Sequence, residues 1–244
     1  GFVYALHSDG SGNLWIGTFG GGLILFDINK EKIIKQFLFD PKNPNGIIDN
    51  RVTTIFEDEN GDYLIGTVAG ICRFNKSEKT FKHYLLSSED SSELSERWIS
   101  KIIKDSDKNF WVGTTAGLFR VDTNGEVKRY IYDLNDEGSI SNSIISSLYE
   151  DENKNIWVGT DDGINMYVAG KDSFIHYFKK DGLSANAITN ITGDTENNLW
   201  ISTIYGITKF NPATNNFRNY DIEDGLQGME FNSGACYKNK NGEI

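Results

Sequence analysis

The 244-residue sequence is poor in the residues that build metal centres and disulfide frameworks. It holds three histidines, three prolines and two cysteines. The cysteines, Cys72 and Cys236, lack the spacing of metal ligands, and we expect both to be buried free thiols. A disulfide between them would require their two strands to be adjacent in space.

Long apolar runs and positive charge are also scarce. No run is long enough to span a membrane as a helix, and no stretch has the pattern of a secretory signal. The 24 Lys and Arg stand against 35 Asp and Glu, which gives a net charge of −11. This balance argues against nucleic acid and against an anionic membrane surface as a partner.

Helical periodicity is missing as well, and a repeat takes its place. The stretch EDENKNIWVGTDDGI at 150–164 recurs four times with small changes, in copies whose Gly-Thr or Ser-Thr ends at Thr18, Thr67, Thr114 and Thr203. A period in the forties made of short strands is typical of one β-propeller blade, which has four antiparallel strands. The period is measured between the recurring aspartates, Asp9, Asp58, Asp105, Asp151 and Asp194, whose steps are 49, 47, 46 and 43 residues.

Each repeat divides into four expected strands. In the second repeat the first strand is Val52–Glu57, the second carries the tryptophan position, and the third is Ile71–Phe74. The recurring Asp is expected to close an Asx turn between the first two strands. The small residue after the second strand's apolar core, for example Gly159, is expected to let an adjacent blade approach. The expected fourth strands are aromatic: Phe37–Phe39, Phe81–Tyr84, Tyr130–Tyr132, Phe174–Tyr177 and Phe217–Tyr220.

The sequence therefore predicts an all-β fold, a single β-propeller segment of four-stranded antiparallel blades. Five blades are complete and a sixth begins. Their approximate bounds are 2–40, 51–86, 98–132, 144–178, 187–220 and, for the partial blade, 231–244.

The stretch DGLSANAITNITGDTENNLWISTIYGITKFN at 181–211 resembles the repeat of two-component regulator propellers. All five cycles match the half that runs from the Asp to the Gly-Thr, and the leading DGL stands at Asp181–Leu183 and Asp224–Leu226. The resemblance implies a seven-bladed propeller in the periplasmic sensor region of a hybrid two-component histidine kinase, a sensor of polysaccharide breakdown products. Because both ends interrupt a repeat, we expect a segment of a longer protein, with membrane contact only through parts outside it.

The sequence gives little support for catalysis. His83 and His176 occupy the same outer-strand position of their repeats, which favours a structural role, and His7 on an inner strand is expected to pack or face solvent. No histidine pair has ligand spacing and no serine stands in a nucleophile elbow. We expect no catalytic residue, no metal and no cofactor, and hence no enzyme activity in this segment.

Binding has a better case. In a blade, the start of the first strand and the turn after the second strand lie at the same face of the disc. Several residues at these two places depart from their equivalents in the other repeats, so the blade itself does not require them. An aromatic surface beside Arg, Asn and Asp is typical of sugar recognition. The predicted ligand-binding residues are Phe19, Arg51, Arg97, Trp98, Asp161, Asn186 and Tyr205.

The leading hypothesis is a periplasmic sensory module that binds a carbohydrate, an oligosaccharide or another small ligand. It would signal through a homodimer of the full-length sensor to a downstream histidine kinase. One alternative is a propeller lyase or hydrolase of the streptogramin-lyase type, which a cluster of His, Glu and metal at the channel mouth would favour. The other is a protein–protein interaction scaffold, since propellers host all three functions.

Overall fold

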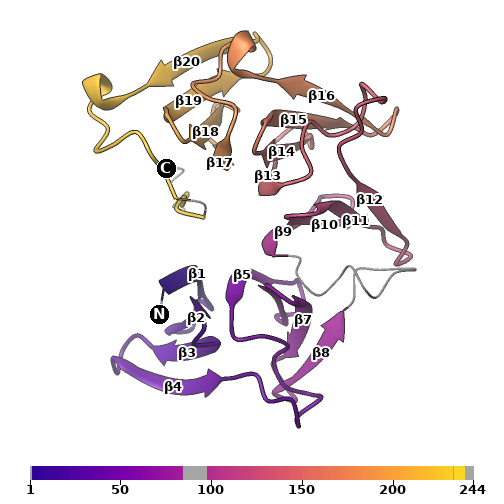
Figure 1. Ribbon diagram of the computed structural model, residues 1–244. Helices are drawn as coiled ribbons and strands as arrows, with labels where there is room; N and C mark the ends of the chain where they lie inside the picture. The colour runs from indigo at the N-terminus through magenta and orange to yellow at the C-terminus, as the bar shows by residue number, and fades with distance from the viewer. Residues whose placement is uncertain (1, 85–97, 233, 240–244) are drawn as a thin grey trace. The chain divides into compact units, whose positions relative to one another are not determined.

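The computed structural model describes residues 2–84, 98–232 and 234–239 (Figure 1). Over these residues the regular structure is β-strand, apart from two short 3-10 turns, η1 (Lys179–Asp181) and η2 (Ile222–Asp224). The strands form five four-stranded antiparallel sheets, one for each repeat. The prediction of an all-β fold with five four-stranded blades is confirmed.

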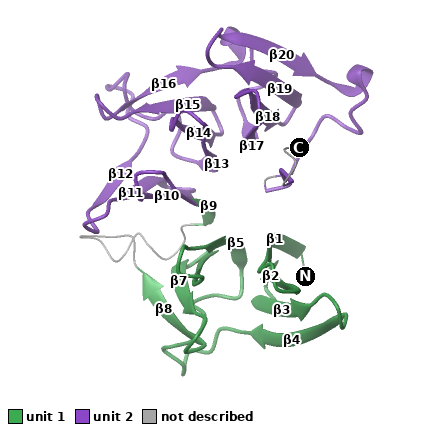
Figure 2. Cartoon of the chain, turned by 180° about the vertical axis from the view of Figure 1, so that it is seen from behind, with its two compact units in different colours: residues 1–102 green, residues 103–244 purple. Residues whose placement is uncertain are grey.

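The chain divides into two compact units, residues 1–102 and 103–244 (Figure 2). The first unit holds two complete sheets. Their strands are β1 (Phe2–Ser8), β2 (Asn13–Phe19), β3 (Leu23–Asp27) and β4 (Lys32–Phe37), then β5 (Val52–Glu57), β6 (Tyr63–Thr67), β7 (Gly70–Asn75) and β8 (Thr80–Tyr84).

The third sheet begins at the end of the first unit and continues into the second, which also holds the fourth and fifth sheets. Within each sheet the strands pair in chain order. The strands are β9 (Ile99–Lys104), β10 (Phe110–Thr114), β11 (Gly117–Val121) and β12 (Val127–Tyr130); β13 (Ile145–Glu150), β14 (Ile156–Thr160), β15 (Gly163–Val168) and β16 (Ser173–Tyr177); and β17 (Ile188–Gly193), β18 (Leu199–Thr203), β19 (Gly206–Asn211) and β20 (Asn216–Tyr220).

Two of the expected fourth strands are wrong by several residues. The strands are Lys32–Phe37 rather than Phe37–Phe39, and Val127–Tyr130 rather than Tyr130–Tyr132. The turn after the third strand fixes the register, and the last pairs are Leu23 with Phe37 and Leu118 with Tyr130. Later aromatic residues have no partner on the third strand, so hydrophobicity alone placed these strands too far along the chain.

The described residues of the expected sixth blade, 231–232 and 234–239, contain no strand. The segment instead runs beside the fifth sheet, where Gly234 N donates to Asn190 Oδ1 at 3.2 Å and Asn190 Nδ2 donates to the Asn232 carbonyl at 3.2 Å. A strand requires a paired neighbour, and none follows within the described residues. Cys236 is accordingly exposed rather than buried, whereas Cys72 is buried, and burial raises the pKa of its thiol to about 12.

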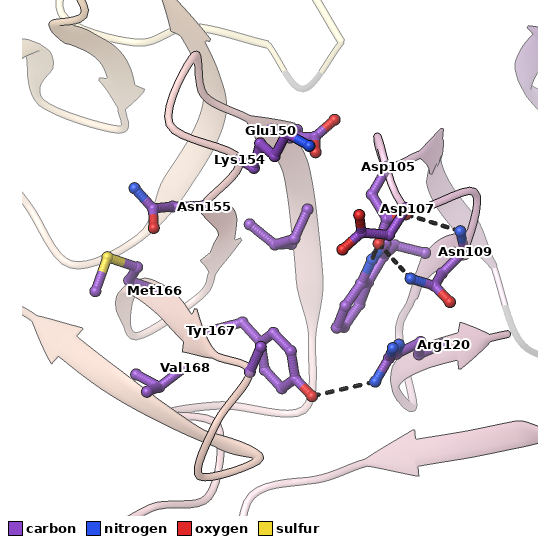
Figure 3. A pocket seen from close by; sticks show the side chains of 13 residues that line it. Asp105, Asp107, Asn109, Arg120, Glu150, Lys154, Asn155, Met166, Tyr167 and Val168 are labelled. Carbon is purple, nitrogen blue, oxygen red and sulfur yellow. Dashed lines mark hydrogen bonds between the residues drawn. The ribbon is translucent and has the colours of Figure 1, made fainter.

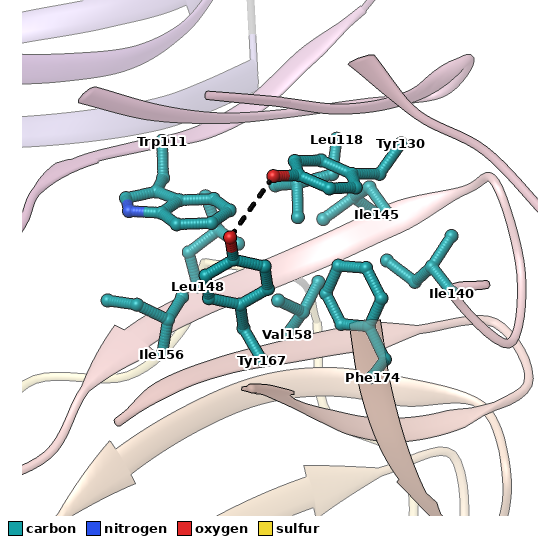
Figure 4. Close-up of a cluster of buried hydrophobic side chains, with 10 residues drawn as sticks. All are labelled: Trp111, Leu118, Tyr130, Ile140, Ile145, Leu148, Ile156, Val158, Tyr167 and Phe174. Atoms are coloured by element: carbon teal, nitrogen blue, oxygen red, sulfur yellow. Dashed lines mark hydrogen bonds between the residues drawn. The ribbon is translucent and has the colours of Figure 1, made fainter. Parts of the chain in front are cut away.

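Apolar side chains fill the space between neighbouring sheets. In the second unit, Trp111 from the third sheet packs with Tyr167 and Phe174 from the fourth (Figure 4). The ring centroids of Trp111 and Tyr167 are 4.9 Å apart. The third and fourth blades therefore share one hydrophobic core.

The recurring Asp closes the expected turn and also holds the tryptophan. In the fourth repeat, Asp151 Oδ1 accepts from the backbone N–H groups of Asn153 and Asn155, both at 2.9 Å. Asp151 Oδ2 accepts from the indole N–H of Trp157 at 2.8 Å. The same bond joins Asp105 to Trp111 at 2.7 Å. One carboxylate thus fixes the hairpin turn and the orientation of a buried ring.

The small residue at the end of the second strand's apolar stretch is confirmed as a point of close approach. A Cβ placed on Gly159 would lie 2.7 Å from Ile188 Cγ2, on the first strand of the next sheet. We expect Gly159→Ala to lower the free energy of unfolding by about 1–3 kcal/mol, because the neighbouring strand must shift. Urea unfolding monitored by tryptophan fluorescence measures this loss.

Gly170→Ala is the matched control, because nothing lies within 4 Å of its added Cβ. We expect it to change the free energy of unfolding by less than about 0.5 kcal/mol. Equal effects of the two substitutions would contradict the close-approach explanation.

Candidate ligand-binding site

Three aromatic side chains meet in the first unit. Tyr4 lies on β1, Phe19 ends β2, and Trp98 directly precedes β9. The ring centroids are 5.5 Å apart for Tyr4 and Phe19, 5.4 Å for Tyr4 and Trp98, and 5.6 Å for Phe19 and Trp98. Tyr4 is 41% exposed and the other two are partly buried. We call these three residues the aromatic cluster.

A β-bulge directs the side chain of Tyr4 toward the cluster. The pairing of β1 with β2 shifts register between Val3 and Ala5, so Tyr4 is the extra residue. Bulges re-aim a side chain relative to the regular pleat. The second, fourth and fifth repeats bulge at the same place, where they carry the small polar residues Thr53, Ser146 and Thr189. The sequence analysis did not predict Tyr4. The signal that could have identified it is a large aromatic residue at a position where other repeats have a small polar one.

Arg51 lies beside the cluster, because it forms a β-bridge with Phe19. Its Nε donates to Asp49 Oδ1 at 2.9 Å and its Nη2 donates to Asp49 Oδ2 at 2.6 Å. Burial acts to raise the pKa of Asp49, but the hydrogen bonds and charge of Arg51 outweigh it and lower the pKa below its usual value. The aromatic surface is therefore bordered by an ion pair, and Asp49 is a further residue that sequence reasoning missed.

The structure thus brings together three of the predicted residues, Phe19, Arg51 and Trp98. Arg97 lies outside the described residues. The other three predictions, Asp161, Asn186 and Tyr205, belong to the second unit.

The side chain of Asn186 is used by the fold. Its Oδ1 accepts from Lys179 N at 2.6 Å and its Nδ2 donates to Asp162 Oδ1 at 2.8 Å. At the same place in the second repeat, Asn50 Oδ1 accepts from Phe39 N at 2.7 Å. This bond ties the end of a fourth strand to the start of the next blade. Its recurrence gives Asn186 a structural role that the sequence did not predict.

Asp161 and Tyr205 are exposed and follow second strands of neighbouring sheets. Partial desolvation of the carboxyl by its neighbours still raises the pKa of Asp161. Tyr205 is 58% exposed, and its backbone N–H donates to Thr203 Oγ1 at 2.9 Å. Both side chains are open to solvent, but the aromatic cluster is where predicted residues gather.

The histidines have different partners. His83 Nε2 contacts the Gly46 carbonyl at 2.8 Å and His176 Nε2 contacts the Ser139 carbonyl at 2.7 Å, which confirms a shared structural role. His7 Nε2 contacts Glu57 Oε2 at 2.7 Å. Among the described residues, no group of three or more His, Cys, Asp or Glu is placed to hold a metal ion.

A cavity of about 230 Å³ opens between the third and fourth sheets of the second unit (Figure 3). Arg120 on β11 and Tyr167 on β15 both line it and meet there, with Arg120 Nη1 donating to Tyr167 Oη at 3.3 Å. Asp107, Glu150 and Lys154 also line it. Sequence reasoning assigned no role to these residues, although a basic residue within the apolar stretch GLFRV was visible.

The five sheets and their pairing define a segment of a β-propeller. The two component regulator propeller family matches four parts of the chain, residues 1–20, 46–69, 138–162 and 182–205. The chain therefore carries two component regulator propeller repeats. No curated protein matched the chain.

Solved structures share the fold. The extracellular domain of the hybrid two component system BT3049 from B. thetaiotaomicron matches with a TM-score of 0.79 and 24% identity, covering 98% of this chain and 31% of that one. PorZ of Porphyromonas gingivalis matches with a TM-score of 0.69 and 18% identity, covering 94% and 35%. A streptogramin B lyase matches with a TM-score of 0.64 and 18% identity, covering 90% and 68%. The chain thus spans about a third of the first two proteins, and none of the helices in its described part has the length and apolarity to cross a membrane.

Proposed function

We propose that this chain is a ligand-binding segment of a sensor propeller in a hybrid two-component system. The segment would lie in the periplasm and pass ligand binding, through a homodimer of the full-length protein, to a histidine kinase. The family match supports the sensor class. The likeness to an extracellular domain of a hybrid two component system supports the fold on which this proposal rests.

The proposed ligand is a carbohydrate or oligosaccharide held at the aromatic cluster. The observation that carries the proposal is the meeting of Tyr4, Phe19 and Trp98 at positions where the other repeats have different residues. Aromatic rings stack on the apolar faces of sugars, and the bordering pair of Arg51 and Asp49 offers planar donors and acceptors for hydroxyl groups.

Calorimetric titration with a panel of oligosaccharides tests the proposal. We expect Trp98→Ala to weaken the binding of the recognised glycan at least about tenfold, which corresponds to about 1.4 kcal/mol. Phe39→Ala is the matched control, because Phe39 is a 45% exposed aromatic residue of the same unit that lies outside the cluster. Binding that persists unchanged in Trp98→Ala, or the lack of binding by any glycan, would count against the proposal.

A lyase is the second candidate, because the likeness to streptogramin B lyase covers 68% of that enzyme. At 18% identity this likeness extends to the fold alone. Incubation of the chain with a streptogramin B antibiotic, followed by mass spectrometry, separates the candidates. A cleaved antibiotic would favour the lyase, and an unchanged antibiotic would favour the binding module.

A further inference from the structure

One position on the third strand carries a basic residue in three sheets. Arg73, Arg120 and Lys209 each pair across the hairpin with the residue at the tryptophan position of the second strand. In the second sheet, Arg73 Nη2 donates to Asp58 Oδ2 at 2.8 Å and Arg73 Nε donates to Asp62 Oδ2 at 3.1 Å. In the fifth sheet, Lys209 Nζ lies 3.2 Å from Asp194 Oδ2. Two of the three cations therefore have carboxylate partners.

Arg120 has no carboxylate within 4.0 Å among the described residues. Its guanidinium contacts Tyr167 and lies over the Trp111 ring, 5.6 Å from the centroid. Its Nε is buried and has no hydrogen-bond partner. Burial acts to lower the pKa of Arg120, but Tyr167, Tyr130 and Asp105 outweigh it and raise the pKa, so a charged guanidinium stands at the cavity.

One substitution distinguishes the surroundings of Arg120 from those of Arg73. Asn109 stands where the second repeat has Asp62, so one carboxylate is missing. The remaining carboxylate, Asp105, accepts three other hydrogen bonds. Its Oδ1 accepts from Asn109 N at 2.7 Å. Its Oδ2 accepts from Asn109 Nδ2 at 2.8 Å and from Trp111 Nε1 at 2.7 Å. Arg120 therefore has one carboxylate fewer than Arg73, and Asp105 acts on it electrostatically without an ion pair within 4.0 Å.

The cavity of about 230 Å³ lies at Arg120. Ile156 lines it where the first unit has Tyr63, whose ring packs 4.9 Å from that of Trp15. The smaller side chain leaves the space that an aromatic ring occupies in the first unit. Pockets for drug-sized ligands measure about 300–1,000 Å³, so this cavity suits a smaller molecule.

We propose that this cavity binds a small hydroxylated carboxylic acid, the size of one sugar ring, with its carboxylate on Arg120. A carboxylate matches the planar fork of a guanidinium in a bidentate contact. Hydroxyl groups of the same ligand can donate to Asp107, which is exposed at the cavity, and Lys154 also lines it. Asp107 and Glu150 disfavour a doubly charged anion such as phosphate, which selects a singly charged acid bearing hydroxyl groups.

Titration with D-glucuronate, D-glucose and acetate tests this assignment. Glucose lacks the carboxylate, and acetate lacks the ring and its hydroxyls. We expect glucuronate to bind at least about tenfold more tightly than either. We expect Arg120→Met, which keeps an apolar stem over Trp111, to weaken glucuronate binding at least about tenfold.

Asn109→Asp provides the second variant, because it restores the carboxylate that the second repeat has at this position. The new carboxylate would neutralise Arg120, so we expect glucuronate binding to fall at least about tenfold while the thermal midpoint stays within a few degrees of the wild type. Failure of glucuronate to bind the wild type, or binding that both variants leave unchanged, would overturn the proposal.

The same variants separate this cavity from the aromatic cluster. Arg120→Met is expected to leave the binding of a glycan at the cluster unchanged. If Arg120→Met weakened both ligands equally, the cavity would not be an independent site, and the proposal would fail.

Discussion

Trp157→Ala is expected to lower the free energy of unfolding by about 3–5 kcal/mol, the range for removing a fully buried aromatic side chain. The ring is fully buried and packs with residues of the fifth sheet, including Phe210, whose centroid lies 5.8 Å away. Its removal also deletes the hydrogen bond that the indole N–H donates to the buried carboxylate of Asp151. Urea unfolding measured by circular dichroism reports the loss.

Two variants separate packing from hydrogen bonding in this effect. Trp157→Phe keeps a ring and removes the indole N–H. We expect it to lower the free energy of unfolding by about 1–2 kcal/mol. Trp200→Ala is the matched control, because this tryptophan makes the same bond to Asp194 at 2.9 Å but is only partly buried. We expect Trp200→Ala to lower the free energy of unfolding by less than half as much as Trp157→Ala does. Equal losses for Trp157→Ala and Trp200→Ala would show that burial between sheets does not dominate.

Arg73→Met is expected to lower the free energy of unfolding by about 2–3 kcal/mol, because it leaves two partly buried carboxylates without their cation. The side chains of Asp58 and Asp62 are 8% and 16% exposed. The second repeat has Leu64 at the tryptophan position, so Asp58 lacks an indole donor and relies on Arg73. The guanidinium thus replaces the missing tryptophan bond.

Lys209→Met is the matched control for Arg73→Met. Burial acts to raise the pKa of Asp194, but hydrogen bonds from Trp200 and Asn198 outweigh it and hold the pKa well below its usual value. These donors remain after Lys209 is removed, so we expect Lys209→Met to lower the free energy of unfolding by less than about 1 kcal/mol. Parallel urea titrations compare the two variants. A larger loss of unfolding free energy for Lys209→Met would refute the idea that Arg73 replaces the missing tryptophan hydrogen bond in the second repeat.

Local patterns in the sequence were enough to predict the blades. Alternation, turn residues and the recurring Asp placed strands such as Val52–Glu57 correctly, because hairpin pairing depends on residues close together in the chain. The fourth strands were harder to predict. Their bounds follow from register across a turn, and register is not visible in hydrophobicity.

The candidate sites were only partly predictable. Departure from the repeat identified Phe19, Arg51 and Trp98, which the structure brings together, but it also selected Asn186, whose side chain ties two blades. Tyr4 escaped because a bulge, not its position in the pattern, aims its ring at the cluster.

The sequence by itself determined the repeat, the five sheets and the turn that each recurring Asp closes. Only the tertiary structure decided which exceptional side chains meet and which charged groups line a cavity. Arg120 illustrates the difference, because its place at the cavity depends on Tyr167 and Ile156 of the next sheet. The physical reason is that strands form from neighbours in the chain, whereas sites form where separate strands and sheets pack together.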